Sequence, residues 1–180
     1  MAATTAAPQL RTLPDYLRSG LRLVFVGTNP GELSARAGHY YARKSNHFWP
    51  LLREAGFVPA SFSCEDDASV LEHGIGLTDL CKRPTAGVNG LSCDEMAAGA
   101  VALRTKLRRF RPRVVCFNGK AAFEGYAGRR CDFGLQLERV EGALAFVVPS
   151  TSPRVTAYTR AGRLPYFIEL KRLVEQEALR

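Results

Sequence analysis

The cysteines of this chain are few and scattered. There are five, an odd number, and no two of them form a Cys-x-x-Cys pair. This pattern argues against a disulfide framework, a zinc ribbon or an iron–sulfur cluster. Cys116 lies inside the apolar run 114–117, where it is most simply a small core residue. We therefore expect a protein of the reducing cytoplasm.

Long hydrophobic runs are also missing. No stretch approaches the roughly 18 consecutive apolar residues of a membrane-spanning helix, so we expect no membrane partner. The first eight residues are small and polar and lack the apolar core of a signal peptide. We expect residues 1–12 to form a disordered tail and residues 13–180 to form one domain, with a transit peptide left open as an alternative.

Two common nucleotide-binding motifs are absent from the sequence. It contains no G-x-x-x-x-G-K-[ST] phosphate loop and no Asp/Glu cluster for magnesium. No G-x-G-x-x-G follows the first predicted strand, which excludes a dinucleotide-binding Rossmann enzyme. We predict no metal and no cofactor. A nucleotide hydrolase that uses Gly27–Gly31 as a phosphate cradle stays open as an alternative.

Positive charge is what the chain has in excess. Its 180 residues include 25 Lys and Arg against 17 Asp and Glu, which gives a net charge of +8. Such a balance favours a polyanionic partner, with nucleic acid first and an acidic membrane surface second. The alternative is a basic but otherwise ordinary enzyme. The hydrophobic content of 46% is sufficient for the core of one domain.

Apolar runs that are typical of buried strands alternate with helical segments. The strands are predicted at 21–27, 75–80, 113–117 and 143–148, and the last pairs with 133–139. Helices are predicted at 14–18, 47–55, from Ser92 to before Pro112, after Lys120, and at 164–179. Residues 28–44 are predicted as a loop and 58–69 as a surface connection. The alternation predicts a single three-layer α/β domain whose short, mostly parallel central sheet is flanked by helices.

Two loops follow strands of this predicted sheet. Gly27–Gly31 follows the first strand, and Val148–Arg154 follows the last one. The carboxyl ends of parallel strands share one edge of a sheet, so the two loops can meet over one site. The first loop offers the Asn29 amide and backbone donors, and the second offers hydroxyl groups and an arginine. Neither loop has the carboxylate or histidine that usually marks a hydrolase.

Aromatic and cationic residues are interleaved in the segment 38–49, GHYYARKSNHFW. This mixture suits a surface that stacks on a nucleobase and holds a phosphate backbone.

Together these segments resemble the mismatch-specific uracil/thymine-DNA glycosylases, a branch of the uracil-DNA glycosylase superfamily. The resemblance rests on segments that occur in the family order: Gly27–Gly31, 38–49, Gly74–Leu80, Arg83–Thr85, Phe117–Lys120 and Pro149–Arg154. It implies a monomeric, monofunctional glycosylase that initiates base excision repair and is nucleoid-associated if bacterial. Such an enzyme flips uracil, mismatched thymine or another modified pyrimidine out of double-stranded DNA and hydrolyses its N-glycosidic bond. A damaged-DNA-binding protein without catalysis is the alternative.

The resemblance also assigns roles to individual residues. Asn29 would hold the attacking water, and Tyr41 would stack on the flipped base. Because an amide is a poor base, the reaction would depend on easy departure of the base as an anion, and turnover would be slow. Arg154 would fill the space that the base leaves. The base pocket would contain Gly27, Thr28, Pro30, Ser34 and Tyr41, and the DNA contacts would come from His39, Arg43, Lys44, Lys120, Ser150, Ser152 and Arg154.

Asp79 departs from the family pattern, in which Asn or Lys is found close to the base. A partly buried carboxylate at the end of a strand can accept a hydrogen bond from the base or act as a second handle on the water. We hypothesise that Asp79 adds base-like activity beside Asn29. The alternative is that Asp79 only caps the loop at Lys82 and Arg83. Asn118, in an Asn-Gly-Lys turn, is predicted to be structural, and Glu32 would repel phosphate if it faced the DNA.

Overall fold

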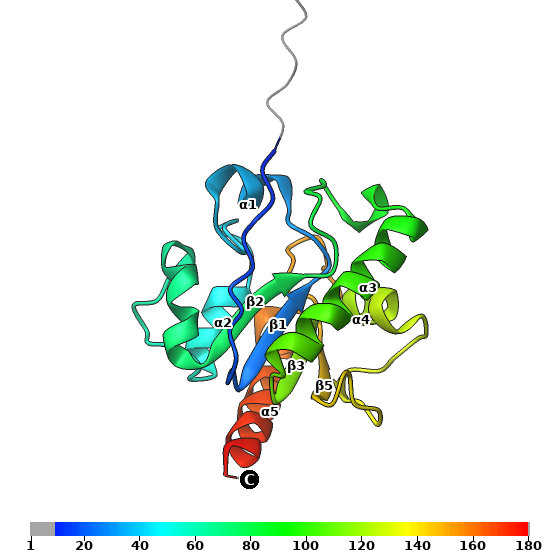
Figure 1. Cartoon of the computed structure of the whole chain (residues 1–180). Helices are drawn as coiled ribbons and strands as arrows, with labels where there is room; N and C mark the ends of the chain where they lie inside the picture. The colour runs from blue at the N-terminus through cyan, green and yellow to red at the C-terminus, as the bar shows by residue number, and fades with distance from the viewer. Residues whose placement is uncertain (1–9, 180) are drawn as a thin grey trace, which may run out of the picture.

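A five-stranded sheet forms the centre of the computed structural model, which describes residues 10–179 (Figure 1). The strand order is β2-β1-β3-β5-β4, and only β4 is antiparallel to its neighbour. The strands are β1 Leu23–Gly27, β2 Ile75–Asp79, β3 Val114–Asn118, β4 Gly134–Leu135 and β5 Leu144–Val148. The mostly parallel sheet confirms the predicted α/β class. Residues 1–9 of the predicted tail lie outside the described residues.

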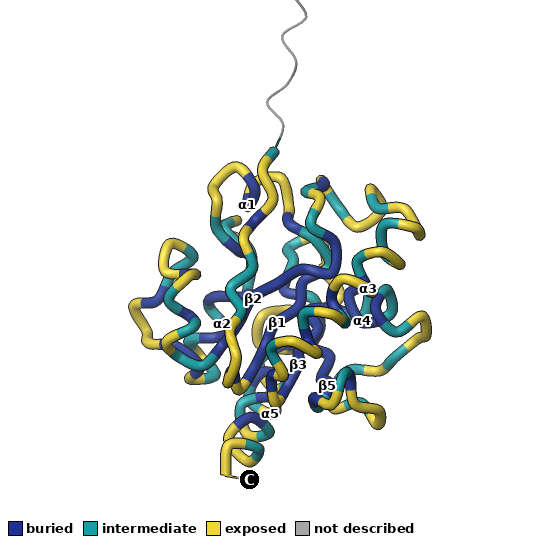
Figure 2. The backbone as a smooth tube through the Cα atoms, in the orientation of Figure 1, coloured by how far each residue is buried: buried dark blue, intermediate teal, exposed yellow. Residues whose placement is uncertain are grey.

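Helices cover both faces of the sheet, so the inner strands are buried almost completely (Figure 2). Helices α2 (Phe48–Glu54) and α5 (Arg160–Ala178) pack with Phe25 on one face. Helices α3 (Cys93–Phe110) and α4 (Lys120–Ala127) pack with Val24 and Val26 on the other. A strand that is buried on both faces needs apolar residues at successive positions, which explains why the runs do not alternate.

Local signals in the sequence set several helix boundaries. The Ser92 side chain accepts a hydrogen bond from the Glu95 backbone, and the Glu95 carboxylate accepts one from the Ser92 backbone, so α3 begins with the predicted capping box. Asn46 Oδ1 accepts from the Phe48 backbone at 2.9 Å before α2. Gly56 ends this segment with a φ of 73°.

Two of the predicted local structures near the N-terminus are wrong. Residues 14–18 do not form a helix, because Tyr16 forms an antiparallel bridge with Leu77. This bridge provides hydrogen-bond partners for the backbone N–H and carbonyl of Leu77 at the edge of β2. The predicted loop 28–44 contains helix α1 (Glu32–Ala37), which ends at Gly38 in the left-handed conformation. Six residues make fewer than two turns, which is too short to give a recognisable helical period.

Other differences lie in the connections. The predicted surface connection 58–69 leads into the 3₁₀ helix η1 (Cys64–His73), whose Asp67 is buried. A second 3₁₀ turn, η2 (Val88–Gly90), precedes α3. The predicted strand 133–139 shrinks to β4, and the C-terminal helix begins four residues before the predicted start at 164. None of the helices in residues 10–179 is long and apolar enough to cross a membrane.

Candidate functional site

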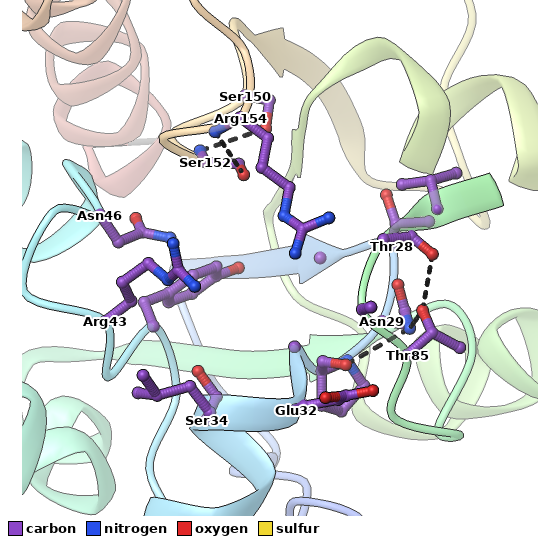
Figure 3. Close-up of a pocket in the computed structure, with 18 of the residues that line it drawn as sticks. Thr28, Asn29, Glu32, Ser34, Arg43, Asn46, Thr85, Ser150, Ser152 and Arg154 are labelled. Carbon is purple, nitrogen blue, oxygen red and sulfur yellow. Dashed lines mark hydrogen bonds between the residues drawn. The ribbon is translucent and has the colours of Figure 1, made fainter. Parts of the chain in front are cut away.

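A cavity of about 950 Å³ opens at the carboxyl edge of the parallel strands. Its walls come from the ends of β1, β2 and β3 and from the loop after β5. Both loops that the sequence singled out line it, through Gly27–Gly31 on one side and Ser150–Arg154 on the other (Figure 3). Distant segments therefore meet over one site because parallel strands end at a common edge.

The Asn29 side chain is oriented by its amide nitrogen. Nδ2 donates to Thr85 Oγ1 at 2.7 Å, to the Arg83 carbonyl at 3.0 Å and to the Pro30 carbonyl at 3.3 Å. Thr85 donates its own hydroxyl proton to the Gly87 carbonyl, so its oxygen is an acceptor for Asn29. In Figure 3 the amide oxygen of Asn29 points away from Thr85. The hydrogen bonds of the Asn29 side chain in residues 10–179 all use Nδ2, so the side chain is fixed and its oxygen remains as an acceptor at the cavity.

Asp79 lies directly beside Gly27, its partner in the parallel register. A Cβ at position 27 would lie 2.5 Å from Asp79 Oδ1 and 3.1 Å from the Tyr41 hydroxyl, so only glycine leaves room for these two groups. Asp79 is 3% exposed. In residues 10–179, Asp79 Oδ2 and the Tyr41 hydroxyl have no hydrogen-bond partner. Buried polar atoms without partners are rare and mark a site where a ligand or water can bind.

Burial raises the pKa of Asp79 to about 7, and the positive charge of Lys82 opposes that rise. Lys82 Nζ is 3.8 Å from Asp79 Oδ2 but only 2.8 Å from Asp15 Oδ1, and Asp15 itself raises the pKa of Asp79 further. Asp15 also pairs with Lys106 at 2.6 Å. The carboxyl of Asp79 can therefore change its protonation state near neutral pH, as a general base must.

The ring of Tyr41 lines the cavity and packs on Phe48, with ring centroids 3.9 Å apart and an interplanar angle of 26°. Its backbone has a positive φ of 53°. Ser34 is buried in the same wall, where its Oγ accepts a hydrogen bond from the Ala42 backbone at 3.1 Å. This bond fixes helix α1 against the segment that carries Tyr41.

A side-chain pair holds the start of the loop after β5. Asn118 Nδ2 donates to Thr151 Oγ1 at 2.9 Å, and the Thr151 backbone donates to Asn118 Oδ1 at 3.0 Å. Ser150 and Ser152 accept from the backbones of Ser152 and Arg154, both at 3.3 Å. The exposed Arg154 side chain reaches into the cavity toward the side that carries Thr28 (Figure 3). Both polar ends of the Asn118 side chain are thus bonded to Thr151, and Asn118 also lines the cavity.

Most of the residues predicted for the site share this cavity, but three do not. Thr28, Pro30 and Arg43 are in its lining, and so is Glu32. The three outside the lining are His39, Lys44 and Lys120. His39 Nδ1 lies 3.2 Å from Asp67, and Lys120 lies 3.7 Å from Asp132 and above the Phe133 ring.

Asp67 is an organising residue that the sequence did not reveal. It is 1% exposed, and its Oδ2 accepts from the Tyr40 backbone at 2.8 Å. Its Oδ1 accepts from the Tyr16 hydroxyl at 3.3 Å, so it ties the pocket segment to the N-terminal segment that contains Tyr16. No pattern in the acidic stretch 65–67 distinguishes this carboxylate from its neighbours. Among residues 10–179, no group of three or more His, Cys, Asp or Glu side chains is placed to hold a metal.

The sequence and the fold are similar to those of known proteins. Residues 14–173 match the family described as the uracil DNA glycosylase superfamily. The chain is 35% identical over 161 residues to a "G/U mismatch-specific uracil DNA glycosylase" from Schizosaccharomyces pombe. This alignment covers 83% of the chain. The match spans half the length of that relative.

A solved structure is similar over almost its whole length. It is the solution NMR structure of a protein from Methanosarcina acetivorans that is provisionally described as a uracil DNA glycosylase. The TM-score is 0.64 at 25% identity, and the match covers 92% of this chain and 98% of the other. On the family match, the relative and the shared fold, this chain belongs to the uracil DNA glycosylase superfamily.

Proposed function

We propose that this protein is a monofunctional DNA glycosylase that removes uracil from double-stranded DNA and so initiates base excision repair. Mismatched thymine and other modified pyrimidines are further substrates. The observation that carries the proposal is the orientation of Asn29, whose nitrogen is held by three acceptors while its oxygen is left for a water molecule. The family membership and the name of the fission yeast relative support it.

In this reaction, water adds to C1′ of the sugar as the bond between C1′ and the base nitrogen breaks. Asn29 Oδ1 accepts a hydrogen bond from the water and orients it, but a neutral amide cannot take its proton. The electron pair of the broken bond leaves with the base, which departs as an anion. The enzyme therefore favours bases that are stable as anions, with uracil first.

Asp79 supplies the missing proton acceptor in this proposal. It lies beside Gly27, two residues from Asn29 along the chain, and its pKa of about 7 leaves a large ionised fraction at neutral pH. Its Oδ2 has no other hydrogen-bond partner in residues 10–179. The alternative role, capping the Lys82 and Arg83 loop, has less support, because Lys82 binds Asp15 more closely and Arg83 pairs with Glu95 at 2.5 Å.

The cavity suits a flipped pyrimidine in a basic protein. The Tyr41 ring stacks on Phe48 and lines the cavity, where it can stack on a base. Arg43 and Arg154 supply positive charge at the cavity, and the net charge of +8 supports a DNA partner with salt-sensitive affinity. Glu32 also lines it, which keeps phosphates away from that wall. We propose a cytoplasmic monomer, in line with the five free cysteines.

The test is alkaline-cleavable nicking of end-labelled duplexes that contain G·U, A·U or G·T, with single-stranded uracil for comparison. All assays contain EDTA, under single-turnover conditions, and compare the wild type with Asn29→Ala. Gln136→Ala, which removes an amide outside the cavity lining, is the control. We expect Asn29→Ala to lose at least about a hundredfold in rate, as when a positioned catalytic group is removed, and Gln136→Ala to keep the wild-type rate.

The same assay separates the alternatives. Tight binding of uracil-containing duplex with no abasic product would identify a damaged-DNA-binding protein. Activity on a nucleotide that EDTA abolishes would identify the hydrolase. Wild-type rates for Asn29→Ala would refute the proposed mechanism.

A further inference from the structure

Arg163, in the first turn of α5, is a buried cation. Its residue exposure is 1%, which is as low as that of Asp67 and lower than that of any other charged residue in 10–179. Its Nε donates to the Ser150 carbonyl at 2.8 Å and its Nη2 to the Val155 carbonyl at 2.6 Å. Its Nη1 donates to the Tyr158 carbonyl and lies 3.0 Å from His47 Nδ1. The guanidinium is therefore surrounded by acceptors.

All of these acceptors are uncharged groups. Within residues 10–179, Arg163 forms no ion pair with a carboxylate. Burying a cation without a counterion is costly, and burial lowers the pKa of Arg163 accordingly. A cation in the first turn also opposes the dipole of its own helix. Stability of α5 alone therefore does not account for this residue.

What Arg163 does contact is the loop between β5 and α5. This loop, residues 149–159, contains no helix or strand, and it presents Ser150, Ser152 and Arg154 to the cavity. Arg163 donates to carbonyls at the start, in the middle and at the end of this loop, those of Ser150, Val155 and Tyr158. A trans peptide points its N–H opposite to its carbonyl, so the peptides of Val155 and Tyr158 direct the N–H groups of the next residues away from Arg163. The N–H that follows the Ser150 carbonyl is that of Thr151, and it donates to Asn118.

We propose that Arg163 is a positioning residue that shapes the loop 149–159 for contact with a DNA phosphate, with neutral His47 as its partner. The proposal rests on the proposed function for the identity of the ligand, but the ordering of the loop can be measured without DNA. The buried charge acts on the outer face of the loop as well, since a cation behind the carbonyls favours an anion in front of the N–H groups.

His47 makes this arrangement sensitive to pH. Its backbone N–H donates to the Thr151 carbonyl at 3.1 Å, so it also holds the loop. The groups that face it are Arg163 and Arg160 from α5 and Glu54 from α2. Burial and the two arginines lower the pKa of His47, which keeps Nδ1 free to accept from Arg163. Protonation in acid would remove the acceptor and place two cations in contact.

The experiment measures amide hydrogen exchange over residues 150–159 in free Arg163→Ala, with and without low-millimolar guanidinium. Sodium at the same ionic strength is the salt control. Arg160→Ala is the matched variant, because it removes a half-exposed arginine of the same turn that pairs with Glu54 at 3.2 Å. We expect exchange in the loop to accelerate by at least about tenfold in Arg163→Ala and to slow again with guanidinium only. Arg160→Ala should match the wild type.

DNA binding is measured in parallel with a duplex that carries a non-hydrolysable abasic-site analogue. We expect Arg163→Ala to bind about tenfold more weakly, with guanidinium restoring affinity. Wild-type exchange in the Arg163→Ala loop, or no response to guanidinium, would overturn the positioning role. Loop exchange that responds while DNA affinity does not would retain the loop anchor and overturn its link to DNA.

Two further measurements apply even if Arg163→Ala does not fold. In the wild type, the protection of the loop amides should fall as pH drops through the pKa of His47, and His47→Asn, which keeps an acceptor but cannot be protonated, should abolish that fall. Arg163→Lys keeps the charge but cannot span three carbonyls, so its loop should exchange faster than in the wild type. A loop with no pH response and full protection in Arg163→Lys would contradict the proposal.

Discussion

Replacing Asp79 with asparagine should change how the stability of the protein depends on pH. Burial raises the pKa of Asp79 from 3.8 to about 7 in the folded protein, whereas the unfolded chain has the ordinary value. The stability that Asp79 contributes is therefore fully present below pH 3.8, the pKa of Asp79 in the unfolded chain. It is lost as the pH rises through about 7, the pKa of Asp79 in the folded protein. At about 1.4 kcal/mol for each tenfold change in the protonation equilibrium, the loss between pH 4 and pH 8 is about 4 kcal/mol.

Asp79→Asn removes this titration and keeps the side-chain shape. The buried amide costs about 1–3 kcal/mol where its hydrogen bonds are incomplete. The variant should therefore be less stable than the wild type at pH 4 and more stable by about 1–3 kcal/mol at pH 8. The cost in function would be lower glycosylase activity.

The assay is urea unfolding followed by fluorescence of Trp49, the single tryptophan, which is 4% exposed in the core. Subtracting the two curves cancels every titration that both proteins share. Asp132→Asn, at a fully exposed carboxylate, is the control and should track the wild type at all pH values. A difference between Asp79→Asn and the wild type that stays constant from pH 4 to pH 8 would refute the argument from burial.

Three further substitutions test other parts of the site. Gly27→Ala places a Cβ 2.5 Å from Asp79 Oδ1, so we expect about 1–3 kcal/mol of destabilisation in urea unfolding and loss of uracil release. Unchanged stability and activity would show that the strand moves to accommodate the Cβ. Thr85→Val removes the closest acceptor of the Asn29 amide, so the single-turnover rate should fall about tenfold while the affinity for duplex DNA stays the same. A loss of affinity with an unchanged rate would contradict this role of Thr85. Lys82→Met removes the charge that lowers the pKa of Asp79, so the carboxyl ¹³C titration of Asp79 should move to higher pH; a move to lower pH would reverse the assigned sign.

The sequence was sufficient for the architecture because the relevant signals are local. Strands buried on both faces require continuous apolar runs, and these runs predicted the four main strands within a few residues. The capping box at Ser92 and Glu95 is satisfied within one helical turn, so α3 could be placed without any tertiary information. The topology of a parallel sheet then required the loops after β1 and β5 to share an edge, which predicted the cavity that contains Asn29 and Arg154.

Only the tertiary structure decided how these groups are held and charged. Asp15, Asp67 and Arg163 contact partners between 5 and 116 positions away, and no spacing along the chain distinguishes them from other charged residues. The same limit applies to Asp79, whose position at the end of β2 was predicted but whose pKa depends on burial and on Lys82. Desolvation and charge pairing depend on everything that packs around a group, so the sequence identified the groups that can act, and packing determined their orientation and protonation.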